Sequence, residues 1–279
     1  MKMAEMWIQL ENYMKYLKDK ERGDLTRQQY RRDIEMFLRK ETTEEITKEV
    51  MIAYKEYLTE NYRPSSVNVK LAAINGFLKF LGKSNLRVGQ LKIQRRAYCS
   101  GERELKKKDY MKLIDTAEKE NNRKLSLIIQ TICGTGIRVS ELKYLTVQAV
   151  RRGEAYIQLK GKSRIILIGG KLKKRLLAYI KKENIRQGEI FITRNKKPLD
   201  RSNIWKMMKK LCKKAGVDEK KVFPHNLRHL FARCFYEREK DIAKLADVLG
   251  HSSINTTRIY IATSGGEHRK ILDALGLVV

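Results

Sequence analysis

The sequence predicts a mainly α-helical protein with a helical N-terminal domain and a mostly helical second domain that holds a small antiparallel β-sheet. Its length of 279 residues corresponds to about two domains at ~150 residues each. Apolar residues recur at helical spacing through most of the chain, and the clear strand-type runs are confined to residues 155–168. We therefore expect one domain over 1–90, a linker over 91–105 and a second domain over 106–279.

The N-terminal domain is expected to be a bundle of helices around one small core. Segments 26–29 and 42–45 each have the form of a capping box, which opens a helix. Pro64 suits the first turn of a further helix, and Gly82 suits its end. The apolar positions that give the first helix its period are Trp7, Leu10, Met14 and Leu17.

The second domain combines further helices with one predicted hairpin. Its strands are expected at 155–159 and 164–168, joined by a Gly-containing turn at 160–163, and 189–193 is a candidate third strand. The helices expected around it cover 106–117, 125–133, 202–215, 226–239, 241–249, 254–260 and 267–275.

The charge of the chain points to a polyanionic partner. Lys and Arg exceed Asp and Glu by 61 to 32, and residues 151–220 alone hold 22 basic against 6 acidic side chains. Such an excess of one sign suits nucleic acid. The alternative is a lysine-rich surface produced by an AT-rich genome.

Several other classes of protein are disfavoured. The longest central stretch without charge, 125–137, has 13 residues, too few for a membrane span of ~20. The N-terminus carries Glu5 and does not resemble a signal peptide. The four cysteines form no Cys-x-x-Cys pair. Tyr156 stands where a phosphate loop ending in Gly161-Lys162-Ser163 requires glycine. We therefore expect a cytoplasmic protein with reduced thiols, no membrane partner, no cofactor and no metal.

Five polar positions in the second domain could bind or react with a phosphate. Arg138 follows a Gly-rich turn at an expected helix start, where an anion is held well. His225 and Arg228 are three residues apart and share a helical face. His229 follows too closely to share that face, and we expect it to pack in the core or to support the residues that contact the phosphate. Each of these residues, His251 and Tyr260 included, is more often structural when taken alone.

Basic side chains along the chain are candidate DNA contacts. In the helix at 202–215, lysines flank an apolar stripe of Trp205, Met208 and Leu211 that is expected to pack inward. A solvated lysine face explains the pattern equally well. The candidate contacts are Lys162, Arg164, Lys206, Lys209, Lys210, Arg95 and Arg96.

Taken together, these segments resemble the catalytic domain of the tyrosine recombinase (phage integrase) family over residues 106–264, in the family's order and spacing. The resemblance implies that Tyr260 attacks DNA to form a 3′-phosphotyrosyl bond, without metal or ATP. It implies that Arg138 and Arg228 bind the phosphate oxygens, that His225 assists proton transfer and that His251 hydrogen-bonds the phosphate. A hairpin lysine protonates the 5′-oxygen; we favour Lys160, and a turn one residue shorter than usual leaves Lys162 open.

The resemblance also implies partners and an activity. The N-terminal region is similar to the family's core-binding domain, and the partner would be double-stranded DNA with inverted-repeat core sites. A monomer in solution would form a homotetramer on DNA, with an accessory DNA-bending protein left open. The implied function is site-specific recombination for integration, excision, inversion or resolution. The alternatives are a catalytically silent DNA-binding regulator and a type IB topoisomerase-like enzyme.

Overall fold

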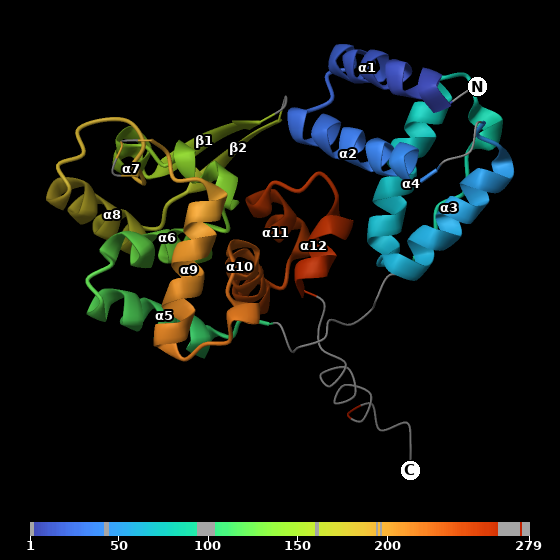
Figure 1. Cartoon of the computed structure of the whole chain (residues 1–279). Coiled ribbons are helices and arrows are strands. Elements are labelled where there is room, and N and C mark those ends of the chain that lie inside the picture. The colour runs from blue at the N-terminus through green and yellow to red at the C-terminus, as the bar shows by residue number, and fades with distance from the viewer. Residues whose placement is uncertain are drawn as a thin grey trace. The chain divides into compact units, whose positions relative to one another are not determined.

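A computed structural model describes residues 3–41, 45–93, 104–159, 162–193, 195, 197–261 and 274. The described chain is mostly helical with a two-stranded antiparallel sheet, which confirms the predicted fold class (Figure 1). It divides into two compact units, residues 1–95 and 96–279. Within the described residues, no helix is both long and apolar enough to cross a membrane.

The first unit is built from helices packed around one core. These are α1 (Met3–Asp19), α2 (Asp24–Lys40), α3 (Lys48–Asn61) and α4 (Pro64–Phe80), followed by a 3-10 turn at Ser84–Leu86. Helix α4 is buried along one side and packs against each of the other helices. Its fully buried side chains include Val67, Leu71, Ile74 and Phe77.

The starts of these helices differ in part from the sequence-based expectation. Pro64 does open α4. Helix α2 begins at Asp24 after Gly23, with no side-chain cap, so the capping box expected at 26–29 is wrong. The box expected at 42–45 falls largely on residues outside the described chain. Helix α3 is instead capped by Thr47, whose hydroxyl accepts a hydrogen bond from the Val50 N–H.

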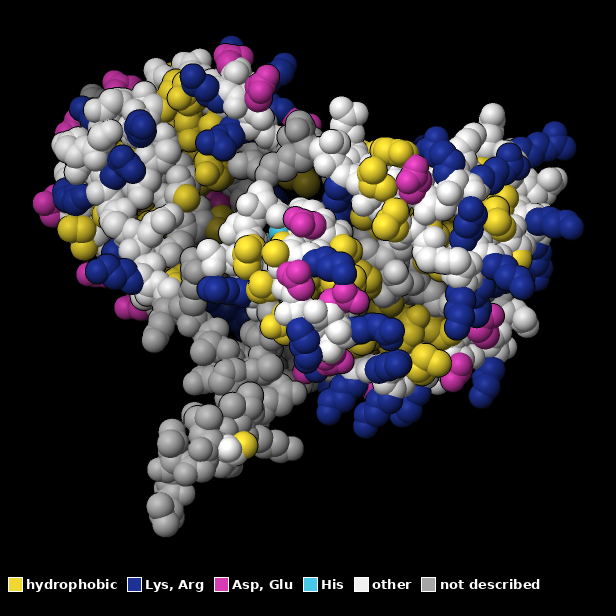
Figure 2. Space-filling view, turned by 180° about the vertical axis from the view of Figure 1, so that it is seen from behind, with side chains coloured by type: hydrophobic (Ala, Val, Ile, Leu, Met, Phe, Trp, Pro, Cys, Tyr) yellow, Lys and Arg dark blue, Asp and Glu magenta, His cyan; other side chains and the backbone are white. Residues whose placement is uncertain are grey.

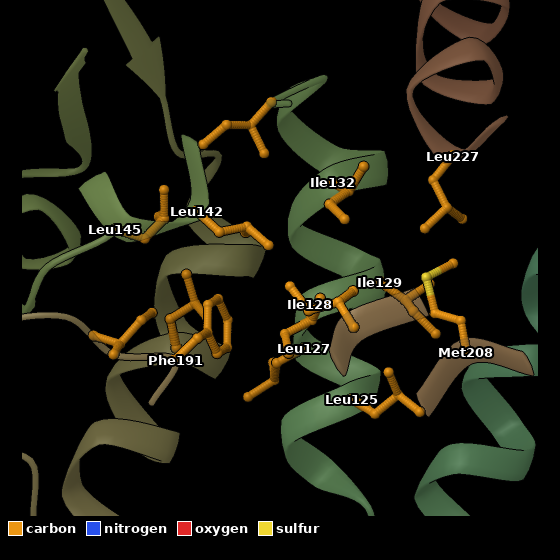
Figure 3. Close-up of a cluster of buried hydrophobic side chains, with 14 of the residues drawn as sticks. Leu125, Leu127, Ile128, Ile129, Ile132, Leu142, Leu145, Phe191, Met208 and Leu227 are labelled. Carbon is orange, nitrogen blue, oxygen red and sulfur yellow. The ribbon is translucent and has the colours of Figure 1, made fainter. Parts of the chain in front are cut away.

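The second unit surrounds α6 (Arg123–Thr135) with other helices. These are α5 (Lys107–Lys119), α7 (Val147–Arg152), α8 (Gly170–Lys182), α9 (Arg201–Ala215), α10 (Pro224–Glu239), α11 (Ile242–Leu249) and α12 (Ile254–Ile261), with 3-10 turns η3 (Val139–Tyr144) and η4 (Glu219–Lys221). Helix α6 packs against α5, α8, α9 and α10. Figure 3 shows its Leu127, Ile128 and Ile132 among the buried side chains of this core. A helix buried on most sides gives its C-terminal end a fixed position.

The sheet consists of β1 (Glu154–Leu159) and β2 (Lys162–Leu167), paired from Glu154 with Leu167 to Leu159 with Lys162. Because Leu159 pairs with Lys162, β2 begins two residues earlier than the expected strand at 164–168. The third strand expected at 189–193 is wrong. That segment forms isolated bridges with Thr146 and Pro198, because its backbone pairs with the turn before α7 and with a neighbouring loop.

The apolar stripe of α9 is also shifted from its expected position. Ile204, Met208 and Leu211 are buried, whereas the Trp205 side chain is 46% exposed. A 3.6-residue period allows either residue at the start of the helix to face inward, and packing against α5 and α6 selects Ile204. The helix expected at 267–275 lies outside the described residues, apart from Ala274.

The C-terminal end of α6 is capped by a glycine that the structure requires. Gly136 caps the helix with φ +64°, the left-handed region that favours glycine. A Cβ at Gly136 would lie 2.5 Å from the Phe231 ring and 3.0 Å from Leu249 Cδ2. Backbone strain and close packing therefore both require glycine here.

We expect Gly136→Ala to lower the free energy of unfolding by about 2–4 kcal/mol, because it adds left-handed strain to an overpacked contact. The matched control is Gly134→Ala in the same helix, where the new methyl meets Leu172 at 3.5 Å, an ordinary contact. This control should be neutral or stabilise by about 0.5–1 kcal/mol. Urea unfolding measures both changes, and equal effects would contradict the argument.

Candidate active site

The first side of the site lies where α6 ends and η3 begins. Arg138 precedes η3, and its backbone N–H donates to Glu141 Oε2 at 2.8 Å. Its guanidinium Nη1 donates to Glu141 Oε1 at 3.0 Å. The Arg138 side chain is 42% exposed. Glu141 thus orients a guanidinium that still faces solvent, as expected for a group that receives a ligand.

Glu141 is itself buried and joins this side of the site to β2. Arg164 Nη2 donates to Glu141 Oε2 at 2.5 Å, and Arg164 Nη1 donates to the Val248 carbonyl at 3.2 Å. Burial opposes ionisation of Glu141, but the Arg138 N–H and the charge of Arg164 outweigh it and hold its pKa below the usual range. Arg164, a candidate DNA contact, therefore has its guanidinium engaged with the protein interior.

Arg228, on the first turns of α10, is the central cation of the site and only 1% exposed. Its guanidinium donates to the Gly136 carbonyl and, at 2.8 Å, to the Leu249 carbonyl. It also lies 2.8 Å from His251 Nε2. Burial and the neighbouring Arg138 lower its pKa to about 10, so it stays charged at neutral pH. One side chain thus joins α10 to the ends of α6 and α11.

Tyr260, on α12, packs beside Arg228 and is 7% exposed. The centroid of its ring lies 4.2 Å from that of His229, 5.3 Å from that of His251 and 5.4 Å from that of His225. Arg228 Cζ lies 5.8 Å from the ring centroid, and the two side chains share a hydrogen bond. The phenol oxygen is therefore held beside a fixed positive charge.

The histidines around Tyr260 are neutral at pH 7. Burial, with the charges of Arg228, Arg138 and Arg201, lowers the pKa of His225. Burial also lowers the pKa of His229 and of His251 to about 4 in each case, reinforced by Arg228. A neutral imidazole can accept a proton.

A cavity of about 540 Å³ opens beside these groups. Its lining carries the cation of Arg138, the imidazole of His251 and three hydroxyls, which belong to Ser163, Ser252 and Thr256. Such a mixture of positive charge and donors suits a phosphate group. The complete lining is Arg138, Glu141, Ile157, Ser163, Arg164, Gly250, His251, Ser252 and Thr256.

The remaining candidate residues have varied surroundings. Lys160, Arg95 and Arg96 lie outside the described residues, and Lys162 is described only as backbone of β2. Lys206 and Lys210 are exposed on α9. Lys209 donates to the Glu219 carbonyl and lies 5.3 Å from the Trp205 ring centroid. Within the described chain, no group of three His, Cys, Asp or Glu side chains could hold a metal ion.

Sequence reasoning missed several neighbours of Tyr260 and Arg138. His229 was expected to point away from the face of His225, and this is wrong. The two residues are one helical turn apart, their rings meet at 4.9 Å, and His229 is in close contact with Tyr260. The three-residue spacing of Glu141 from Arg138, typical of a helix cap, is the sequence signal that marks Glu141. No local pattern marks Arg201 or Thr257.

Comparisons with known proteins agree with this site. A family model described as the phage integrase family matches residues 103–266, and one described as phage integrase, N-terminal SAM-like domain, matches 10–85. Tyrosine recombinase XerA of Pyrococcus furiosus is 29% identical over 228 residues, covering 78% of this chain and 77% of the relative. Tyrosine recombinase XerH of Campylobacter jejuni is 30% identical over 246 residues, covering 79% and 67%.

The fold is shared with solved structures as well. A crystal structure of a lambda integrase (75-356) dimer bound to a COC′ core site superposes with a TM-score of 0.74 at 20% identity, covering 95% of this chain and 97% of that one. Together with the family models and the relatives, this match defines the class of the protein: it is a tyrosine recombinase, an enzyme of site-specific DNA recombination. The chain belongs to the phage integrase family.

We expect Glu141→Gln to lower the free energy of unfolding at pH 7 by about 3 kcal/mol, because Arg164 loses its buried counter-charge. The folded pKa of Glu141 is depressed, so its contribution is present above the unfolded value of ~4.3 and is lost as the pH falls through the folded value. The difference between native protein and variant should therefore shrink in acid.

Urea unfolding at pH 7 and at successively lower pH measures this difference. The control is Glu118→Gln, which removes an ion pair with Arg175 whose side chains are 39% and 44% exposed. Its effect should stay below about 1 kcal/mol. A Glu141→Gln difference that does not change with pH would contradict the assignment.

Proposed function

We propose that Tyr260 is the nucleophile of this recombinase. Its phenol oxygen attacks a DNA phosphodiester, forms a 3′-phosphotyrosyl bond and releases the 5′-oxygen; attack by a 5′-hydroxyl on that bond rejoins a strand. One observation carries this proposal. The Tyr260 phenol is hydrogen-bonded to a buried arginine and ringed by neutral imidazoles. A tyrosine with only a structural role does not need an arginine and several imidazoles around its phenol.

The arginines stabilise the phosphate. Arg138 and Arg228 bind the non-bridging oxygens, and their fixed positive charges stabilise the charge that builds up in the transition state. Arg138 is already oriented by Glu141, and Arg228 by backbone carbonyls. Because both guanidinium groups are held before DNA arrives, little reorganisation is needed when the phosphate binds.

The histidines handle the proton and one phosphate oxygen. A phenol is a weak acid, and the Tyr260 hydroxyl must lose its proton as it attacks. His225 takes this proton, because its lowered pKa keeps the imidazole neutral and ready to accept. His251 donates a hydrogen bond to the phosphate from the cavity that it lines.

A lysine of the hairpin turn supplies the other proton. The departing 5′-oxygen is a poor leaving group unless it is protonated as the bond breaks. Lys160, which follows β1 directly in the sequence, is the proposed donor, with Lys162 as the alternative. In this scheme one proton leaves the phenol and another reaches the 5′-oxygen, so the cleavage is balanced without a metal ion or ATP.

The proposed partner is double-stranded DNA with inverted-repeat core sites. The overall excess of basic residues supports it, and Figure 2 shows Lys and Arg side chains crowding the outer edge of the second unit. The lambda integrase of similar fold is itself bound to a core site. Lys206 and Lys210 are the proposed contacts on α9, because both are exposed.

The proposed assembly on DNA is a homotetramer formed from monomers. Recombining two duplexes requires cleavage of four strands, and each chain offers one Tyr260. Four protomers are then the smallest complete set. Because the substrate is DNA, we propose that the enzyme works in the cytoplasm, with an accessory DNA-bending protein as an option.

Covalent trapping tests the nucleophile. Incubation with a nicked duplex carrying a candidate site, such as the inverted repeats flanking its own gene, should yield a denaturant-resistant protein–DNA adduct. Tyr260→Phe should abolish the adduct, because the attacking oxygen is gone. Tyr110→Phe, on α5, is the matched control and should retain it. Tight binding without an adduct on any candidate site would favour a silent DNA-binding regulator.

A modified leaving group tests the lysine. In DNA with sulfur in place of the bridging 5′-oxygen, the departing thiolate has a pKa near ~8.5 and needs no proton. Lys160→Ala should slow cleavage of ordinary DNA by about 10²–10⁴-fold and cleave the sulfur substrate at the native rate. Lys162→Ala should behave like the native protein on both. Rescue of Lys162→Ala in place of Lys160→Ala would overturn the assignment.

A further inference from the structure

The His251 ring is held at both of its nitrogens by different partners. Nε2 lies 2.8 Å from a guanidinium nitrogen of Arg228, and Nδ1 lies 2.8 Å from the Thr257 hydroxyl oxygen. Thr257 is on α12, one turn before Tyr260, and is fully buried. The hydroxyl of Thr257 thus reaches the imidazole on the side away from Arg228.

These partners fix the tautomer of His251 in the DNA-free protein. A guanidinium can only donate, so Nε2 must accept and carries no proton. Burial and the charges of Arg228, Arg138, Arg164 and His225 lower the pKa of His251 to about 4, so the ring is neutral at pH 7. Its single N–H proton is therefore on Nδ1 and is donated to the Thr257 oxygen.

This resting tautomer is the wrong one for the reaction. To donate a hydrogen bond to a phosphate beside Arg228, His251 needs its proton on Nε2. A neutral ring then has a bare Nδ1, which must accept a hydrogen bond. The residue facing Nδ1 must therefore accept in one state and donate in the other.

We propose that Thr257 is a positioning residue that lets His251 change tautomer when DNA binds. A hydroxyl both accepts and donates, so rotation about its C–O bond serves either state. When Arg228 donates to the phosphate in place of His251, Nε2 takes a proton from water of the cavity and Nδ1 returns one to water, with no net change in protonation. The inference rests on the proposed role of His251.

The chain offers a matched set of variants for a test. Thr257→Val keeps the shape and removes the hydroxyl, whereas Thr257→Ser restores the hydroxyl. Thr131→Val, on α6, makes the same change at a buried threonine whose hydroxyl has no partner among the described residues. The sequence has four histidines, so single replacements assign their nitrogen signals.

The first measurement is nitrogen NMR of histidine-labelled protein at neutral pH. In the DNA-free native protein we expect the His251 proton on Nδ1. In Tyr260→Phe protein bound to a half-site duplex, which stays uncleaved, we expect it on Nε2. The same tautomer in both states would overturn the proposal. Because the DNA-free spectrum needs no cleavage, it reports on His251 even if the nucleophile is assigned wrongly.

The second measurement is the rate of covalent adduct formation at saturating nicked duplex. Thr257→Val should form the adduct roughly 10–100-fold more slowly, as when the hydrogen-bond partner of a functional histidine is removed, with unchanged DNA affinity. The rate of Thr257→Ser should stay within about 3-fold of the native rate, and Thr131→Val should form the adduct at the native rate. A native rate for Thr257→Val, or failure of Ser to restore the rate, would overturn the role of the hydroxyl.

Discussion

The buried guanidinium of Arg228 is the interaction on which the rest of the site depends. A charge removed from water is costly unless its donors are satisfied, and here backbone carbonyls at the ends of α6 and α11 supply much of that compensation. Helix ends have carbonyls without helical partners, so they are suitable acceptors. The same guanidinium reaches His251 and Tyr260. Folding of the second unit and assembly of the site are therefore one event.

The balance of charge in the site follows from this arrangement. Arg138 and Arg164 lie close enough to Arg228 to add to the effect of burial in lowering its pKa, and the carboxylate that faces Arg138 and Arg164 is Glu141. Burial, together with the remaining positive charge, keeps the nearby histidines neutral, and that charge favours a bound phosphate. Glu141 thus stabilises the DNA-free protein, and the positive charge that Glu141 does not balance is available to bind DNA.

Much of the fold and part of the site could be predicted from the sequence. The helical period of α4 and α6, the proline at the start of α4 and the hairpin at β1–β2 are local patterns, and the structure confirms them. The prediction of a third strand at 189–193 is wrong, because a β-type run of residues does not reveal which segment its backbone will pair with. The prediction that Trp205 packs inward is wrong, because neighbouring positions of one helical turn can each face the core, and packing selects Ile204.

The sequence by itself determined the class of protein, because ordered segments carrying Arg138, His225, Arg228, His251 and Tyr260 are a one-dimensional signature. Only the tertiary structure decided which groups meet. The contact of His229 with Tyr260, the engagement of Arg164 with Glu141 and the bond from His251 to Thr257 depend on how helices from separate parts of the chain pack. Side-chain contact, burial and tautomer are properties of that packing, and local spacing does not encode them.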